Sequence, residues 1–187
     1  MLGNFLDTRK IFALVLIFIG LVSGVSAGDV SKPPVELSFD PKKIGETYSF
    51  DVNVVEQLNY LVGIRFYLNL PNKWSHFFDK DPDPQEAKRF YEILGAPKKI
   101  ASGEWVEAGV PAKFRVQIIQ KESGKIVSDE LISNPKTRAH AYGRTADLVT
   151  QGLQEGLYSI FVEYLDGAPE LAPLHAKILF SRAHHGK

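Results

Sequence analysis

The sequence predicts an all-β protein: an antiparallel, immunoglobulin-like β-sandwich of about seven strands with a Greek-key corner and one short helix inserted near residues 84–94. Three observations predict this fold. Apolar and polar residues alternate with a period of two through most of the chain, which is typical of strands buried on one side. Polar segments that contain glycine separate these stretches. A single segment has the spacing of an amphipathic helix.

The alternation defines the strands in chain order. It is clearest at residues 46–54, where Tyr48, Phe50 and Val52 point to one side and polar residues separate them. A sandwich packs such apolar sides against each other in its core. Strands are predicted at residues 35–39, 46–54, 60–70, 113–120, 125–132, 157–164 and 174–180.

The helix has start and stop signals of its own. Asp83 can cap its first turn, Pro84 suits the first helical position, and Glu86 completes a capping box. Gly95 ends it. The residues expected to be buried are Ala87, Phe90, Tyr91 and Leu94.

A corner between the two sheets is predicted near residue 156. Leu153 and Gly156 flank a turn, and Tyr158 follows at the beginning of a strand. In Greek-key sandwiches a tyrosine at this place donates its hydroxyl to the backbone upstream and so joins the sheets. The alternative is an ordinary tyrosine at the start of a strand.

The N-terminal segment has the pattern of a secretory signal peptide. A basic start with Arg9 and Lys10 precedes an apolar stretch, and Val25, Ser26 and Ala27 supply the small residues of a cleavage site. The predicted organisation is a signal peptide at 1–27, a flexible leader at 28–34, the sandwich at 35–181 and a disordered tail at 182–187. Periplasmic or secreted location after cleavage near Ala27 is therefore expected, and retention as a membrane anchor is the alternative.

The composition excludes several classes of function. Lysine plus arginine and aspartate plus glutamate both number 22, so there is no basic excess of the kind that nucleic-acid binding requires. Cysteine is absent, which excludes disulfides, thiolate metal sites and cysteine nucleophiles. The five histidines lack metal-binding spacing, and no catalytic or cofactor motif is present. We expect no metal, no cofactor and no enzymatic activity.

One segment is a candidate for partner or ligand binding. If residues 138–144 are extended, Arg138, His140, Tyr142 and Arg144 share one side and small residues share the other. Arginine and tyrosine are enriched at binding hot spots, so such a stripe could hold an acidic partner or an anionic ligand. The alternative is a solvated loop whose arginines pair with nearby acids. Trp74 is a further candidate, either as a stacking platform or as a residue that seats the helix on the sandwich.

The chain resembles a family of small exported bacterial proteins, number 5625 in the series of domains of unknown function. The resemblance covers most of the chain after the signal segment, at residues 48–54, 63–68, 109–116 and 153–171, and includes Gly156 and Tyr158. It implies an immunoglobulin-like sandwich in the bacterial envelope and carries no catalytic residues to transfer.

The expected function is a non-catalytic binding, interaction or structural module of the bacterial cell envelope. Its expected partner is an envelope protein, with no nucleic acid and no membrane span after signal removal. An immunity-type inhibitor of a secreted toxin is a special case. A small carboxylate-dependent hydrolase and a periplasmic carrier remain open alternatives, because carboxylates can meet in space without a sequence motif.

Overall fold

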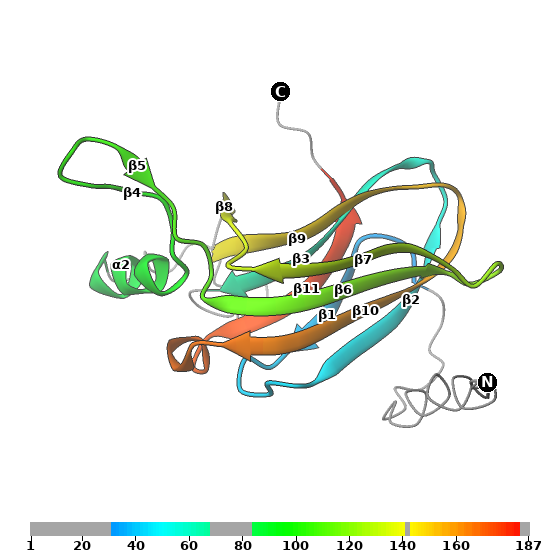
Figure 1. The fold of residues 1–187 in the computed structure, drawn as a ribbon, viewed down its shortest axis with the longest axis horizontal. Helices are drawn as coiled ribbons and strands as arrows, with labels where there is room; N and C mark the ends of the chain where they lie inside the picture. The colour runs from blue at the N-terminus through cyan, green and yellow to red at the C-terminus, as the bar shows by residue number, and fades with distance from the viewer. Residues whose placement is uncertain (1–30, 68–83, 141–142, 184–187) are drawn as a thin grey trace, which may run out of the picture.

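The structure is a computed structural model that describes residues 31–67, 84–140 and 143–183 (Figure 1). Two antiparallel sheets form the sandwich. One has five strands in the order β1-β11-β3-β9-β8, and the other has four in the order β2-β10-β6-β7. The bounds of the five-stranded sheet are Val35–Phe39 (β1), His175–Arg182 (β11), Leu58–Tyr67 (β3), Gly143–Leu153 (β9) and Thr137–His140 (β8). Those of the four-stranded sheet are Thr47–Val54 (β2), Gly156–Gly167 (β10), Ala112–Gln120 (β6) and Lys125–Ser133 (β7).

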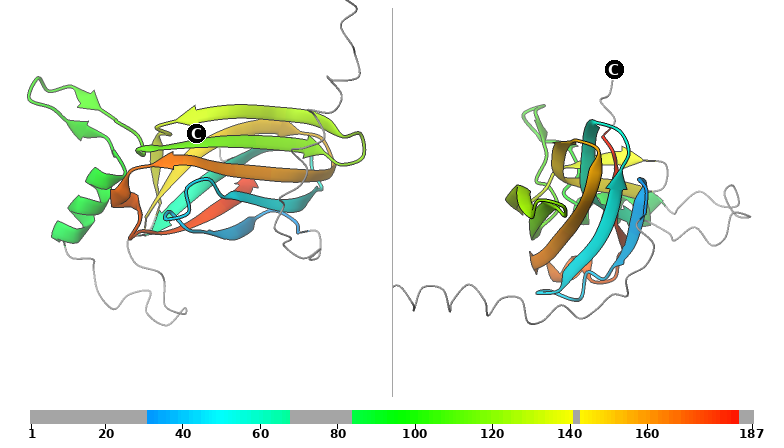
Figure 2. Two further views of the ribbon diagram at one scale, coloured as in Figure 1. Left: turned by 60° about the horizontal axis from the view of Figure 1, so that its bottom comes forward. Right: turned by 90° about the vertical axis from the view of Figure 1, so that its right-hand side faces the viewer.

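The core lies between the inner faces of the two sheets (Figure 2). Along β10, Tyr158, Ile160, Val162 and Tyr164 are buried and alternate with more exposed residues, as the period of two predicts. An aromatic cluster joins the layers: the ring of Phe39 lies 5.1 Å from that of Tyr164 and 6.0 Å from that of Phe114. Contacts of this kind bury large areas, and they give the sandwich its cohesion without disulfides.

The helix α2, Pro84–Ile93, and a small β4–β5 hairpin lie beyond one end of the sandwich (Figures 1 and 2). Phe90 and Leu94 are buried in the core as predicted, and Ala87 is half-buried. The prediction is wrong for Tyr91, whose side chain is 43% exposed. Tyr91 lies at the border of the helical stripe, where its ring contacts Arg144 instead of the core.

The hairpin consists of Lys98–Lys99 (β4) and Trp105–Val106 (β5) and was not predicted, because two-residue strands show no periodicity. β9 was missed for a different reason. Its residues Arg144 and Thr145 are polar yet buried, so polarity does not mark a solvent side, and a bulge opposite Val62 and Gly63 interrupts the period.

The ends of the sandwich differ slightly from the predicted boundaries. Ser31, assigned to the leader, forms a parallel bridge with Val52, and its carbonyl accepts a hydrogen bond from the Asn53 amide. At the other end, β11 includes Arg182, which the sequence assigned to the tail. A short 3-10 helix, Pro169–Leu171, connects β10 to β11. Within the described ranges, no helix has the length and apolar character needed to cross a membrane.

Candidate functional site

Arg138 and Arg144 do not share a side, so the predicted stripe is wrong for these two residues. Residues 138–144 are not one strand: β8 and β9 pair as neighbouring antiparallel strands, with Arg138 opposite Thr145 and Ala139 opposite Arg144. Paired residues point to the same side of a sheet and successive residues to opposite sides. Arg144 therefore lies on the inner side of the five-stranded sheet and Arg138 on its outer side.

Arg144 is a buried connector. Its guanidinium donates from Nε to Thr137 Oγ1 over 2.7 Å and from Nη2 to the Thr137 carbonyl over 3.0 Å. The same group lies 5.7 Å from the centroid of the Tyr91 ring, a distance at which a cation is attracted to an aromatic face. Arg144 thus links β8, β9 and α2 and is not available to a partner.

Arg138 is an exposed member of the predicted set. Its Nε lies 3.0 Å from Asp147 Oδ1, and both side chains are 41% exposed. The contact has the distance of an ion pair, but its angles are not those of a hydrogen bond. Burial raises the pKa of Asp147, and the charge of Arg138 opposes that shift. The ion pair therefore compensates only part of the cost of burying the carboxylate.

Of the other predicted site residues, the structure describes His140 but not Tyr142 or Trp74. The backbone of His140 pairs with Gly143 at the end of β8. Tyr142 and Trp74 lie outside the described residues. Neither stacking by Trp74 nor binding by Tyr142 therefore enters the site described below.

Tyr158 occupies a corner where the chain crosses from the five-stranded to the four-stranded sheet. Its hydroxyl donates to the carbonyl of Gln154 over 3.0 Å. Leu153, at the end of β9, is buried in the core. Gly156 has a φ of 146°, which favours glycine, at the first residue of β10.

A second corner of the same kind was missed by the sequence analysis. Where β2 crosses to β3, the hydroxyl of Tyr60 donates to the carbonyl of Glu56 over 3.0 Å. Tyr60 and Tyr158 are each the third residue of their strand, and each bonds to a carbonyl four residues upstream. The repeated turn–x–x–Tyr spacing was the signal that could have revealed it.

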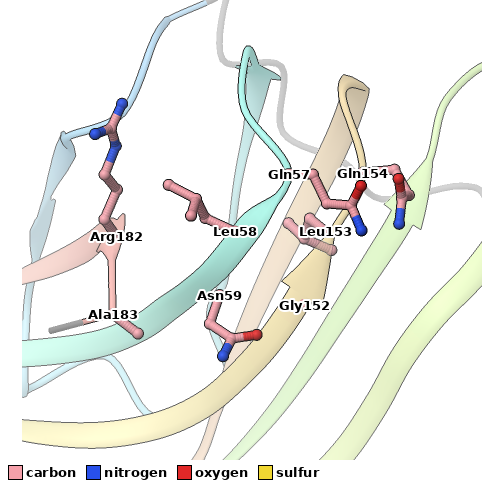
Figure 3. Close-up of a pocket in the computed structure, with 8 residues that line it drawn as sticks. All are labelled: Gln57, Leu58, Asn59, Gly152, Leu153, Gln154, Arg182 and Ala183. Carbon is pink, nitrogen blue, oxygen red and sulfur yellow. The ribbon is translucent and has the colours of Figure 1, made fainter. Parts of the chain in front are cut away.

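The two corners border one pocket of about 620 Å³ (Figure 3). Its walls come from the beginning of β3, the end of β9 and the end of β11. Arg182 is its charged side chain and pairs with Glu56 at 2.6 Å, while Gln57 and Gln154 present amides. The single charge of Arg182 is balanced by the single charge of Glu56, so this pair leaves no excess charge for a ligand to neutralise. Because the corners are also structural, we regard this pocket as part of the scaffold.

The segment from Gly95 to Gly109, here called the projecting hairpin, is held closed at its base. The Gly109 amide donates to the Gly95 carbonyl over 3.1 Å. Both glycines have positive φ, 58° and 78°, and a Cβ on Gly95 would overlap the carbonyl of Gly109. Side chains larger than hydrogen would therefore separate the two ends of the segment.

The base is also attached to the sandwich. The Val110 amide donates to the Pro135 carbonyl over 2.9 Å, and the Glu107 carboxylate accepts from the Thr137 amide over 2.9 Å. Thr137 is the residue that Arg144 contacts from its other side. The projecting hairpin is thus fixed to the same connection that holds α2.

Apolar side chains on the projecting hairpin face solvent. Trp105 is 69% exposed, Val106 is 42% exposed and Ile100 is 39% exposed. The register places Lys99 opposite Trp105 and Lys98 opposite Val106, so each side of the hairpin carries one apolar residue and one cation. Such a surface can insert into an apolar site that has acidic groups at its rim.

Comparison with known proteins identifies the family. The sequence profile described as Domain of unknown function (DUF5625) matches residues 36–182. The chain belongs to this family. The match extends from β1 to the last residue of β11, so the DUF5625 domain includes both sheets, α2 and the projecting hairpin.

A solved structure confirms the architecture of the DUF5625 domain. A crystal structure of a protein from Sulfurospirillum deleyianum is similar to this chain with a TM-score of 0.58 and 16% sequence identity, and the similarity covers 81% of this chain and 98% of that one. At this identity the likeness shows the fold alone. No curated protein matches the chain.

Among the described residues, histidine and carboxylate side chains do not gather in groups of three or more that could hold a metal ion. Several carboxylates on the strands contact cations instead. Asp51 pairs with Lys121 at 2.6 Å, and Asp129 pairs with Arg115 at 2.8 Å. These contacts suit sheet stabilisation.

Proposed function

We propose that this DUF5625 protein is a non-catalytic binding module of the bacterial cell envelope, and that it docks on a partner protein through the projecting hairpin. The exposure of Trp105 carries the proposal. Tryptophan is among the side chains most enriched at binding hot spots, and it is highly buried on average in folded proteins.

Burial of the hairpin's apolar side chains would supply the affinity. Trp105, Val106 and Ile100 lie on one short segment, and removal of their apolar surface from water is favourable in proportion to its area. Hot spots of this kind contribute about 2 kcal/mol or more each. The hydrogen bonds at the base hold the segment in place before binding, which reduces the entropy lost on association.

Charge favours a particular kind of partner. Lys98 and Lys99 are exposed on opposite sides of the hairpin, so a cleft with carboxylates at its rim matches both sides. A lipid surface matches less well, because Glu104 lies beside the turn that would enter first. The two-sided pattern therefore supports a protein cleft.

An immunity-type inhibitor is the special case of this proposal that the geometry favours. A fixed hairpin that projects from a sandwich can enter and block a cleft of a secreted toxin. Export supports such a role, since residues 1–27 have the pattern of a signal peptide. A carboxylate-dependent hydrolase receives less support, because Asp51, Asp129 and Asp147 each contact a cation.

The test is site-specific photocrosslinking in the native cell. A photoreactive phenylalanine analogue replaces Trp105 in one variant and Ile126, which is 54% exposed on β7, in the control. We expect one discrete envelope protein to crosslink at position 105 and not at 126. With that partner purified, Trp105→Ala weakens binding about thirtyfold, while Ile126→Ala changes it less than twofold.

Three outcomes would contradict the proposal. Crosslinks of equal yield and identity at both positions would remove the role of the hairpin. Full affinity of Trp105→Ala, with an unchanged melting temperature, would do the same. Recovery of the full-length product from the cytosol alone would refute the envelope location.

A further inference from the structure

The outer side of the five-stranded sheet carries a row of cations that crosses all five strands. The register pairs Lys177 of β11 with Arg65 of β3, Arg65 with Thr145 of β9, and Thr145 with Arg138 of β8, and Ser38 of β1 completes the row. Paired residues point to the same side, so the three cationic side chains share one surface. We call this set the cationic row.

A second row lies beside it on the same side. Glu36 pairs with Leu179, Leu179 with Gly63, and Gly63 with Asp147, which places a carboxylate at each end of the row. Glu36 contacts Arg65 at 2.7 Å and Lys177 at 2.8 Å, and Asp147 contacts Arg138 at 3.0 Å. Three cations thus share two carboxylates, which leaves one positive charge in excess.

The hydrogen bonding of this surface is incomplete. Arg65 Nε is buried and has no acceptor among the described residues, although Arg65 Nη1 donates to Glu36. A buried donor without a partner has a free-energy cost that a bound acceptor would remove. Asp147 Oδ1 is likewise buried without a donor in hydrogen-bond geometry. An anionic acceptor would satisfy Arg65 Nε and would also neutralise the one excess positive charge of the surface.

Gly63 lies in the middle of this surface and has no side chain, so the surface there is formed by the backbone. A Cβ at this position would lie 2.8 Å from the Ala146 carbonyl and 3.2 Å from Thr145 Cγ2. Leu179, the residue paired with Gly63, lines a cavity of about 680 Å³ on this surface. The residues that line it are Arg65, Arg138, Glu36, Pro34, Ala139, Thr145, Leu179 and Ser181. This volume lies within the range of small-molecule sites. Charged and polar side chains make up most of the lining, and Pro34, Ala139 and Leu179 add apolar surface.

We propose that the cavity lined by Arg65, Arg138 and Leu179 is a binding site for a carboxylate-bearing ligand of short-peptide size, with Arg65 and Arg138 holding the carboxylate. Guanidinium groups bind oxyanions through a planar fork, which suits this role. A single excess positive charge matches a monoanion. A phosphate dianion would be repelled by Glu36 and Asp147, which already lie on the surface.

The site is separate from the projecting hairpin and is argued from different residues. It stands whether or not the hairpin docks on a protein. The expected ligand is a small, partly apolar molecule that carries one carboxylate.

The test titrates the purified protein with N-acetylated tetra-alanine, followed by NMR. The C-terminal amide of the same peptide is the matched ligand control, and inorganic phosphate is the second probe. We expect the acid to bind at least tenfold more tightly than the amide and than phosphate. Arg65→Gln and Arg138→Gln should each weaken binding of the acid about tenfold. Arg115→Gln, in the equivalent exposed ion pair of the other sheet, should leave it unchanged.

Asp147→Asn gives a prediction in the opposite direction. Asp147 competes with the ligand for Arg138, so its neutralisation should strengthen binding of the acid about threefold. A purely structural ion pair predicts no such gain. The proposal is overturned if the acid does not bind, if amide or phosphate binds equally well, if Arg115→Gln weakens binding as much as Arg65→Gln, or if Asp147→Asn weakens it.

Discussion

Arg138 and Arg144 differ in their environment because one residue of strand register separates their sides of the sheet. Arg144 is 9% exposed and bonds twice to Thr137, whereas Arg138 is 41% exposed and pairs with Asp147. A buried guanidinium leaves unsatisfied groups behind when it is removed, while an exposed ion pair contributes little. The two arginines should therefore differ in their effect on stability.

We expect Arg144→Ala to lower the free energy of unfolding by about 2–4 kcal/mol, since the hydroxyl and carbonyl of Thr137 lose their donor and the stem loses its packing. Arg138→Ala should lower it by about 1 kcal/mol or less. Urea denaturation of both variants measures the difference. Equal effects would show that Arg144 is not the connector described above.

At the scale of elements, the two tyrosine corners hold the crossings between the sheets at one end of the sandwich. Tyr60 and Tyr158 each close a turn with one hydroxyl bond to the carbonyl four residues upstream. The rings of both tyrosines are also buried in the core, so each corner combines packing with the hydroxyl bond. The hydroxyl groups of Tyr60 and Tyr158 therefore contribute to the free energy of unfolding at this end of the sandwich.

Removing either hydroxyl should be measurable. We expect Tyr60→Phe and Tyr158→Phe each to lower the free energy of unfolding by about 1–2 kcal/mol, because a carbonyl loses its donor while ring packing is kept. Tyr91→Phe is the control, as Tyr91 is 43% exposed and should change stability by less than about 0.5 kcal/mol. Denaturant midpoints of the three variants decide the matter; no loss at either corner would contradict it.

At the scale of the whole molecule, a few paired carboxylates govern stability in acid. Hydrogen bonds from Arg115 and Gln117 lower the pKa of Asp129 to about 2. Burial opposes ionisation of Asp51, but hydrogen bonds from Lys121 and Ser159 outweigh it and lower its pKa. In the unfolded chain both groups have a pKa of about 4. The unfolded state therefore binds more protons between these values, and stability falls as pH decreases through them.

We expect the melting temperature to fall between about pH 4 and pH 2, and to fall less in the variant Asp51→Asn/Asp129→Asn. The stabilisation by these carboxylates is complete above about pH 4 and is lost as pH falls through about 2. Asp147 has the opposite sign, since burial raises its pKa, and Asp147→Asn should leave the acid slope in place. Differential scanning calorimetry at low salt measures the slopes; parallel curves for wild type and the double variant would refute the assignment.

Much of the fold follows from local pattern. β2, β6 and β10 of the four-stranded sheet, and β1 of the other, are more buried on one side, and their period of two was visible in the sequence. β3 and β7 were also predicted, but β3 is buried on both sides and β7 leaves Ile126 and Leu131 exposed. The helix was predicted from its caps and stripe. β9 was not, since Arg144 and Thr145 are polar but buried, and no local pattern distinguishes a buried polar residue from a solvated one.

The candidate sites were less accessible to sequence reasoning. Trp105 was not identified as exposed. Its exposure depends on the hydrogen bond between Gly95 and Gly109 that closes the base of the hairpin, and no short sequence motif indicates that these two glycines pair. The cationic row combines Arg65, Arg138 and Lys177 from three strands that are distant in sequence. Strand order and register alone bring them together.

The sequence by itself determined the class of fold, the family and the exclusion of thiol chemistry, because these depend on periodicity, composition and short motifs that each segment carries alone. Only the tertiary structure decided which arginine is buried, that Trp105 faces solvent and which charges share a surface. The physical reason is that side-chain orientation in a strand changes with every residue, so a pairing between distant strands assigns each polar group to the core or to water.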